Sequence, residues 1–78
     1  MNKKNSFSFR KGYNNLRRCD QKKVKEEIME YLQITTEMAW SRRIRGLIIP
    51  TIAEYNFITS VINQNGVPKK DIWEEVEL

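Results

Sequence analysis

Histidine is absent from this chain, and cysteine occurs once, as Cys19 between Arg18 and Asp20. Without histidine, the chain lacks the most common general base and the most common metal ligand of proteins. A zinc site would then need carboxylates at a ligand spacing that the sequence does not show. A lone cysteine cannot form an internal disulfide, which is typical of proteins from a reducing compartment. We therefore expect no enzymatic activity, no metal and no cofactor.

Long apolar segments are also missing. The longest apolar run is Leu47-Ile48-Ile49, far shorter than the ~20 residues of a membrane-spanning helix. The basic start, with Lys3 and Lys4, is followed at residues 5–10 by no apolar core of the kind that signal peptides have. Glycine occurs only three times, and no glycine-rich phosphate loop is present. The sequence therefore predicts a cytoplasmic protein without a membrane contact.

The length and the charge limit the organisation and the partners. A chain of 78 residues with 40% hydrophobic and 31% charged residues makes one small domain. We expect a flexible basic arm over residues 1–8 and a single helical domain over residues 9–78. Residues 1–50 carry 12 Lys/Arg against 5 Asp/Glu, a net charge of +7, whereas residues 51–78 carry 2 against 5, a net charge of −3. This asymmetry favours a polyanionic partner that approaches from one side.

Apolar residues recur at helical spacing along most of the chain. They predict helices at about residues 9–18, 21–32, 35–46, 52–64 and a short last one from Asp71. Gly12 lowers the helix propensity of the first segment by something like 1 kcal/mol. Thr51 and Glu54 have the spacing of a capping box at the start of the fourth helix, which is expected to bury Ile52 and Tyr55. No segment predicts a strand of ordinary length, so we expect an all-α fold, a compact bundle of about five short helices.

The segment over residues 35–46 is the most informative part of the chain. Thr35 or Thr36 can cap its start, and Gly46 can end it in the left-handed conformation. At 100° per residue, Trp40 and Ile44 point to the same side and anchor the helix. The opposite, outer side carries Met38, Arg42 and Arg45, with Ser41 at its edge and Arg43 on its flank.

This outer face has two interpretations. Guanidinium forks, hydroxyls and methyl groups on a helix with an apolar back suit insertion into the major groove of DNA. The same face is also what a solvated basic surface on an ordinary core helix looks like. The helix alone does not decide between them.

The order of the segments resembles the phage-repressor and Cro type of helix-turn-helix DNA-binding domain. The second and third helices, joined by a tight turn, form the helix-turn-helix. Residues 27–34 look like the first helix of the motif and its turn, and residues 40–46 look like the second half of a recognition helix. Pro50 before residues 52–54 and Gly66 before residues 71–73 look like the segments that follow. The resemblance covers residues 9–76.

The resemblance implies sequence-specific binding to double-stranded DNA, usually in transcriptional control in prokaryotes or mobile elements. The base-reading positions of the family fall on Thr36, Glu37, Met38, Ser41, Arg42 and Arg45, and Arg43 completes the expected DNA-contacting set. Arg42 and Arg45 would pair with guanine edges or phosphates, and Met38 would touch a thymine methyl group. Glu37 would either accept a hydrogen bond from a cytosine amino group or, as we mainly expect, favour the helix amino terminus electrostatically.

Three features depart from the family pattern. Gln33 occupies a turn position where the family usually has glycine, and one extra residue lies between Ile34 and Trp40. The third is the apolar run over residues 47–49, where such loops are commonly polar. We expect this run to be buried under the fourth helix. The alternative is an exposed patch for a homodimer or a protein partner, in which case the chain is a protein-interaction module.

Overall fold

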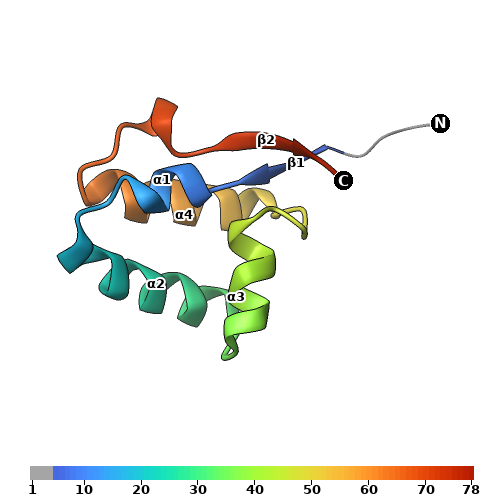
Figure 1. Cartoon of the computed structure of the whole chain (residues 1–78), viewed down its shortest axis with the longest axis horizontal. Helices are drawn as coiled ribbons and strands as arrows, with labels where there is room; N and C mark the ends of the chain where they lie inside the picture. Colours follow the sequence, from blue (N-terminus) through green and yellow to red (C-terminus); the bar gives the residue numbers. More distant parts are fainter. Residues whose placement is uncertain (1–4) are drawn as a thin grey trace.

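The computed structural model describes residues 5–78. Along the chain these residues form strand β1 (Asn5–Ser8), helices α1 (Arg10–Asn14), α2 (Arg18–Leu32), α3 (Glu37–Ile44) and α4 (Ile52–Gln64), a 3-10 turn (Lys69–Asp71) and strand β2 (Glu74–Glu77). Figure 1 shows the two strands at the top, α2 at the bottom, α1 and α4 between them, and α3 at one end of the molecule. Within residues 5–78, no helix has the length and the apolar content that crossing a bilayer requires.

The prediction of an all-α bundle of five helices is wrong. Four α-helices are combined with an antiparallel sheet of two strands, in which Asn5 lies opposite Glu77 and Ser8 opposite Glu74. Residues 5–8, which we expected in a flexible arm, form β1. Residues 1–4 of that arm, with Lys3 and Lys4, lie outside the described residues. The expected last helix is replaced by one 3-10 turn and β2.

The sequence did not predict the two strands because β1 buries polar residues and exposes an apolar one, and because β2 consists mostly of charged residues. In β1 the serines are buried, at 0% exposure for Ser6 and 4% for Ser8, whereas Phe7 is 39% exposed. The buried Ser8 hydroxyl donates to the carbonyl of Ile44 at 2.7 Å, which satisfies its polarity. In β2 three of four residues are glutamates, which have low strand propensity.

The core joins the two ends and the middle of the chain around three aromatic residues. Phe9 contacts Trp40 of α3 and Trp73, with ring centroids 5.6 Å apart in both edge-to-face pairs. Trp73 also donates from Nε1 to the hydroxyl of Thr59 at 2.7 Å, so its polar group has a partner within α4. The fully buried side chains around them are Val24, Ile28, Ile58, Ile62 and Ile72.

Gly12 is required by packing rather than being only a weak point in α1. Its amide donates to the carbonyl of Ile72 at 3.1 Å, which brings the two backbones together. A Cβ atom at this position would lie 2.7 Å from the Cα of Ile72. The neighbouring atom is backbone and cannot rotate away, so a side chain at residue 12 would push α1 off the carboxyl-terminal segment.

We expect Gly12→Ala to lower the free energy of unfolding by about 1–3 kcal/mol, the usual cost of overpacking. Helix propensity alone predicts that Gly12→Ala raises the free energy of unfolding, because alanine favours a helix more than glycine does. Urea denaturation monitored by tryptophan fluorescence measures the difference. Asn14→Ala, at an exposed position of the same helix, is the control and should stay near wild type. A Gly12→Ala protein more stable than wild type would contradict the packing explanation.

Candidate nucleic-acid interface

A four-residue turn over residues 33–36 joins α2 to α3. Gln33 has φ 56° and ψ 45°, the left-handed conformation that glycine adopts most easily. The amide of Gln33 donates to the carbonyl of Glu30 at 3.1 Å, and the amide of Ile34 donates to that of Met29 at 3.0 Å. These two bonds are the Schellman arrangement that ends a helix. Gln33 therefore adopts a backbone conformation that favours glycine, and the turn between α2 and α3 is sharp.

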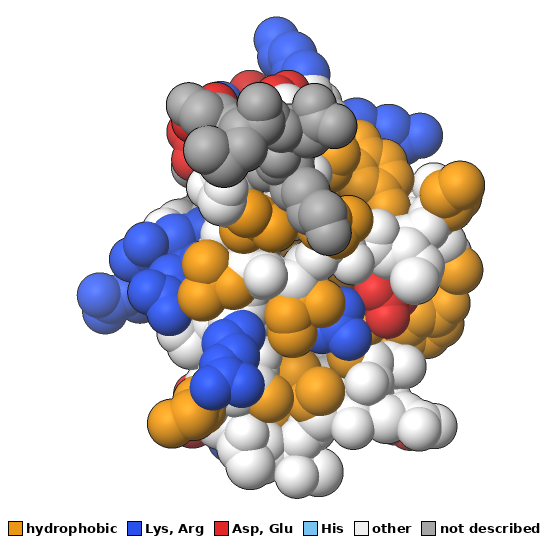
Figure 2. All heavy atoms as spheres, turned by 90° about the vertical axis from the view of Figure 1, so that its right-hand side faces the viewer, with side chains coloured by type: hydrophobic (Ala, Val, Ile, Leu, Met, Phe, Trp, Pro, Cys, Tyr) orange, Lys and Arg blue, Asp and Glu red, His pale blue; other side chains and the backbone are white. Residues whose placement is uncertain are grey.

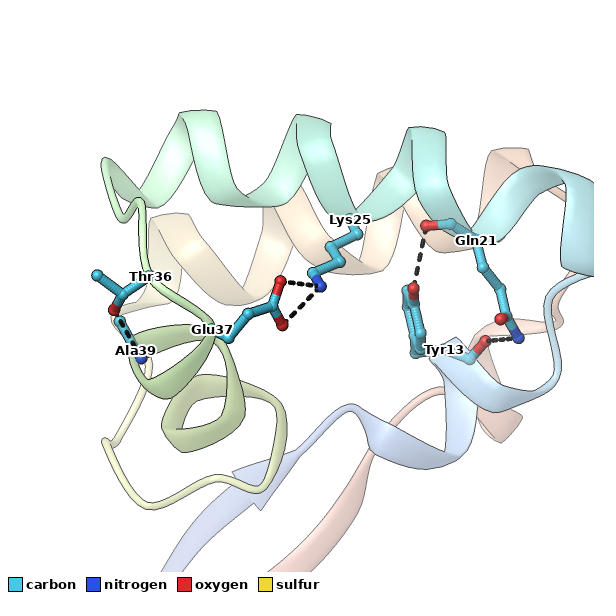
Figure 3. Close-up of polar contacts among 6 residues, drawn as sticks. All are labelled: Tyr13, Gln21, Lys25, Thr36, Glu37 and Ala39. Carbon is cyan, nitrogen blue, oxygen red and sulfur yellow. Dashed lines mark hydrogen bonds and ion pairs between the residues drawn. The ribbon is translucent and has the colours of Figure 1, made fainter.

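The amino-terminal turn of α3 is held by two polar contacts, both drawn in Figure 3. The Thr36 hydroxyl accepts a hydrogen bond from the amide of Ala39 at 3.1 Å, which confirms the expected cap. Glu37 forms an ion pair with Lys25 of α2, whose Nζ lies 2.6 and 2.8 Å from the two carboxylate oxygens. The single acidic side chain of α3 is therefore neutralised by α2. The contact with Lys25 also sets the orientation of the Glu37 side chain.

The carboxyl end of α3 is closed by Gly46, as the sequence predicts. Gly46 has φ 77°, its amide donates to the carbonyl of Arg43 at 3.1 Å, and the amide of Leu47 donates to that of Arg42 at 2.9 Å. A Cβ atom on Gly46 would lie 2.8 Å from the carbonyl oxygen of Phe7 in β1. Both the backbone conformation and the contact with β1 therefore require glycine here.

Trp40 fixes how α3 is rotated about its axis. It is the buried residue of this helix, at 6% exposure. Its ring packs edge-to-face on Phe9 and on Tyr13, with centroids 5.6 and 5.4 Å apart. The Nζ of Lys25 lies 5.6 Å from the centroid of the same ring, within cation–π range. Because Trp40 faces inward, the residues on the other side of α3 face solvent.

Tyr13 supports this cluster with a polar contact to α2. Its hydroxyl donates to the carbonyl of Gln21 at 3.1 Å (Figure 3). Burial raises the pKa of Tyr13 above its ordinary value of 10.0, Lys25 partly opposes this, and Glu37 adds to it. The raised pKa means that the unfolded chain loses this proton first as the pH rises. The neutral hydroxyl therefore stabilises the fold fully below pH 10.0, and this contribution is lost in more alkaline solution.

Four of the seven predicted contact residues share the outer face of α3. Met38 is 66% exposed, Arg42 and Arg45 are exposed, and Ser41 is half-buried at the edge. Arg42 Nη2 lies 3.6 Å from the sulfur of Met38, and Arg45 Nε donates to the carbonyl of Ser41 at 3.4 Å. Within residues 5–78, neither guanidinium forms an ion pair with an acidic side chain. Both arginines keep donors for an external anion.

Arg43 has a different place from the other arginines of α3. Its Nη1 donates to Oε1 of Glu54 in α4 at 3.0 Å, and both side chains are 19% exposed. The same carboxylate oxygen accepts from the amide of Thr51 at 3.0 Å in the capping box of α4. The sequence predicted this box but not that an arginine 11 residues earlier would complete it. Arg43 ties α3 to α4 and points away from the outer face.

The apolar run after α3 is exposed, so the expectation that it lies buried under α4 is wrong. Leu47 is 48% exposed, Ile48 43% and Ile49 47%. The same holds at the start of α4, where Ile52 is 82% exposed and Tyr55 37% exposed, although both were expected in the core. Figure 2 shows this end of the molecule: hydrophobic side chains run from its centre to its right, and Lys and Arg side chains lie at its left and also at its top and upper right.

A groove of about 690 Å³ lies elsewhere, between α2 and α4. Glu27 and Glu30 line it together with Tyr31 and Phe57, whose rings stack with centroids 4.0 Å apart. Carboxylates at this position repel phosphate, so the groove is unsuited to nucleic acid. Among the described residues, no three His, Cys, Asp or Glu side chains are grouped to hold a metal ion.

Comparison with protein-family models, with curated proteins and with solved structures found no match to this chain. What the chain does is therefore inferred from its own geometry and charge. The outer face of α3 is the candidate site: it carries the guanidinium groups of Arg42 and Arg45, which form no ion pair within residues 5–78, together with a thioether and a hydroxyl. Thr36 borders this face at the cap, whereas Glu37 and Arg43 are engaged by Lys25 and Glu54.

We expect Arg43→Ala to lower the free energy of unfolding by about 1–2 kcal/mol, because it removes a charged hydrogen bond and leaves the partly buried carboxylate of Glu54 without its cationic partner. Arg42→Ala is the matched control, since it removes the same side chain one position earlier at an exposed site, and should stay within ~0.5 kcal/mol of wild type. Thermal or urea unfolding of the two variants measures this. Equal stabilities would show that the Arg43–Glu54 pair does not support the fold.

Gln33→Gly tests the turn. We expect a gain in stability of roughly 0.5–1 kcal/mol, because glycine adopts the left-handed conformation without the steric cost of a Cβ atom. Gln33→Val should instead destabilise the protein, since a β-branched residue resists this conformation most. Both are measured by the midpoint of urea unfolding. If glycine and valine shift the midpoint equally, the backbone conformation of residue 33 is not what limits this turn.

Proposed function

We propose that the protein binds double-stranded DNA in a sequence-specific manner, with α3 in the major groove. The observation that carries this proposal is the outer face of α3, where Met38, Ser41, Arg42 and Arg45 are available to a ligand. Helix α3 is held by the ion pairs with Lys25 and Glu54 and by the packing of Trp40 on aromatic rings of the core. A rigidly held helix can place side chains on base edges with a defined register.

The dimensions and the chemistry of α3 fit this role. An α-helix with its side chains is roughly 10–12 Å across, and the major groove is about 12 Å wide, so α3 can lie in it. Arg42 and Arg45 would form bidentate bonds to O6 and N7 of guanine, or single bonds to phosphate. Met38 would contact the methyl group of thymine. The hydroxyls of Ser41 and Thr36 would donate to phosphate oxygens or bases.

The wider charge pattern supports the same partner. The first 50 residues carry a net charge of +7, which attracts a polyanion over a distance of about a Debye length. Neutralisation of Glu37 by Lys25 removes the acidic group that would oppose phosphate at the amino end of α3. Together with the resemblance to phage repressors, this leads us to propose a non-enzymatic, cytoplasmic transcriptional regulator of prokaryotic or mobile-element type.

The test is fluorescence anisotropy of a pooled random DNA duplex titrated with the protein at roughly 50 and 200 mM salt. Several phosphate contacts would weaken binding by orders of magnitude over this range. We expect Arg42→Ala/Arg45→Ala to weaken binding at least ~10-fold at the lower salt concentration, as the loss of one or two base or phosphate contacts implies. Selection of bound sequences from the same pool then tests specificity.

The control is Lys69→Ala/Lys70→Ala, which removes the same two positive charges. These lysines are exposed on the 3-10 turn, which Figure 1 shows at the end of the molecule away from α3. Binding by the control should stay within ~3-fold of wild type, because charges beyond a Debye length are screened. Equal weakening by both double variants would point to non-specific attraction, and no binding by wild type at low salt would refute the proposal.

A further inference from the structure

The groove between α2 and α4 takes no part in the proposed DNA contacts. Its volume of about 690 Å³ lies within the range of about 300–1,000 Å³ that small-molecule sites in proteins have. Tyr31 and Glu27 line it from α2, and Phe57, Ser60 and Gln64 line it from α4. The groove therefore has the size of a ligand site, and it combines an aromatic wall with polar groups.

The aromatic wall of the groove is flat and already formed. The rings of Tyr31 and Phe57 are nearly parallel, with an angle of 6° between their planes and centroids 4.0 Å apart. The stack covers one face of the Tyr31 ring, yet this residue is 43% exposed, so the exposed surface of the ring is its opposite face and its edge. Phe57 packs against the buried core and holds the stack in place. An aromatic face fixed in this way can bind another flat ring or a cation.

The charge of the groove is negative. Glu27 and Glu30 lie three residues apart on α2, which makes them neighbours on the helix surface. Both are exposed, and within residues 5–78 neither carboxylate forms an ion pair or a hydrogen bond. Lys23 lies one turn before Glu27 without pairing with it, and Lys25 is held by Glu37. Among the described residues that line the groove, none is Lys or Arg. The two carboxylates are therefore available to a ligand.

Charge and shape together determine which ligand fits. The chain has a net charge of +4, so most of the molecule repels a cation, whereas the groove attracts it. Anions are repelled by the two carboxylates. A divalent metal ion needs about six oxygen ligands, and no group of three acidic side chains is present within residues 5–78. An organic cation with a flat ring uses both the aromatic wall and the carboxylates.

We propose that this groove binds a small aromatic cation, whose ring stacks on Tyr31 and whose charged end pairs with Glu27 and Glu30. The carboxylates accept charge-assisted hydrogen bonds from the cation. Gln64 donates from Nε2 to the hydroxyl of Ser60 at 3.3 Å, which leaves its carbonyl oxygen for a further donor of the ligand. Because the two carboxylates come from α2 and Gln64 from α4, the complete site exists only in the folded protein. The ligand therefore stabilises the fold.

Benzamidine, a flat ring with an amidinium group, is the probe, and the amide chemical shifts of the labelled protein report its binding. We expect saturable shifts at Tyr31, Gln33, Ser60 and Gln64, which line the groove, and a dissociation constant on the order of 1 mM for a fragment of this size. Benzamide, which has the same shape without the charge, should bind at least ~10-fold more weakly, because it forms no charge-assisted hydrogen bond. The measurement involves no DNA and is independent of the function proposed for α3.

Glu27→Gln/Glu30→Gln tests the carboxylates, because it removes both charges and keeps the size of the side chains. We expect the dissociation constant of benzamidine to rise at least ~10-fold. Glu74→Gln/Glu75→Gln is the matched control, since it removes the same two charges from exposed positions of β2. Figure 1 shows β2 at the top of the molecule and α2 at the bottom. The control should bind benzamidine within ~2-fold of wild type, because distant charges are screened.

The proposal is overturned if benzamidine shifts no groove amide at ~10 mM, about ten times the expected dissociation constant, or if benzamide binds equally well. It is also overturned if Glu27→Gln/Glu30→Gln, folded by circular dichroism, binds as wild type does, or if the two double variants weaken binding equally. A Gly-Arg-Gly peptide blocked at both ends carries the same single charge as benzamidine. Tighter binding of this peptide would identify a segment of a partner protein as the occupant and would overturn the assignment to a small aromatic ligand.

Discussion

The burial of Trp40 is the constraint on which the candidate site depends. Helix α3 is only eight residues long, and Trp40 is its buried side chain. The ring lies against Phe9, which also contacts Trp73 near the carboxyl terminus. These two aromatic contacts therefore link the middle of the chain to both of its ends. Because an aromatic side chain buries a large apolar area with defined geometry, it fixes the rotation of α3 and so the direction of its outer face.

Polar contacts then fix α3 to three neighbours without using its outer face. Ser8 ties it to β1, Arg43 ties it to α4, and Lys25 ties it to α2. Each contact satisfies a group that would otherwise be costly to bury or would repel an anion. Among the arginines of α3 and its carboxyl cap, Arg42 and Arg45 therefore keep donors for a ligand. The proposed contacts with DNA follow from this difference: Arg43 binds Glu54 within the protein, whereas Arg42 and Arg45 are exposed.

The small size of the domain explains why apolar and basic surfaces lie side by side at one end. A chain of 78 residues buries only about 60% of its unfolded surface, so part of its apolar content stays outside the core. Within residues 5–78, nine large hydrophobic residues are exposed, and four of them lie at residues 47–52.

The sequence by itself determined those features that arise between residues close together in the chain. The caps at Thr36 and Thr51, the end of α3 at Gly46 and the limits of α4 were all predicted, because each depends on bonds over three to five residues. Only the tertiary structure decided the pairing of β1 with β2, the need for Gly12 and the exposure of residues 47–49 and Ile52. These depend on residues distant in the chain, which hydrophobic periodicity cannot bring together.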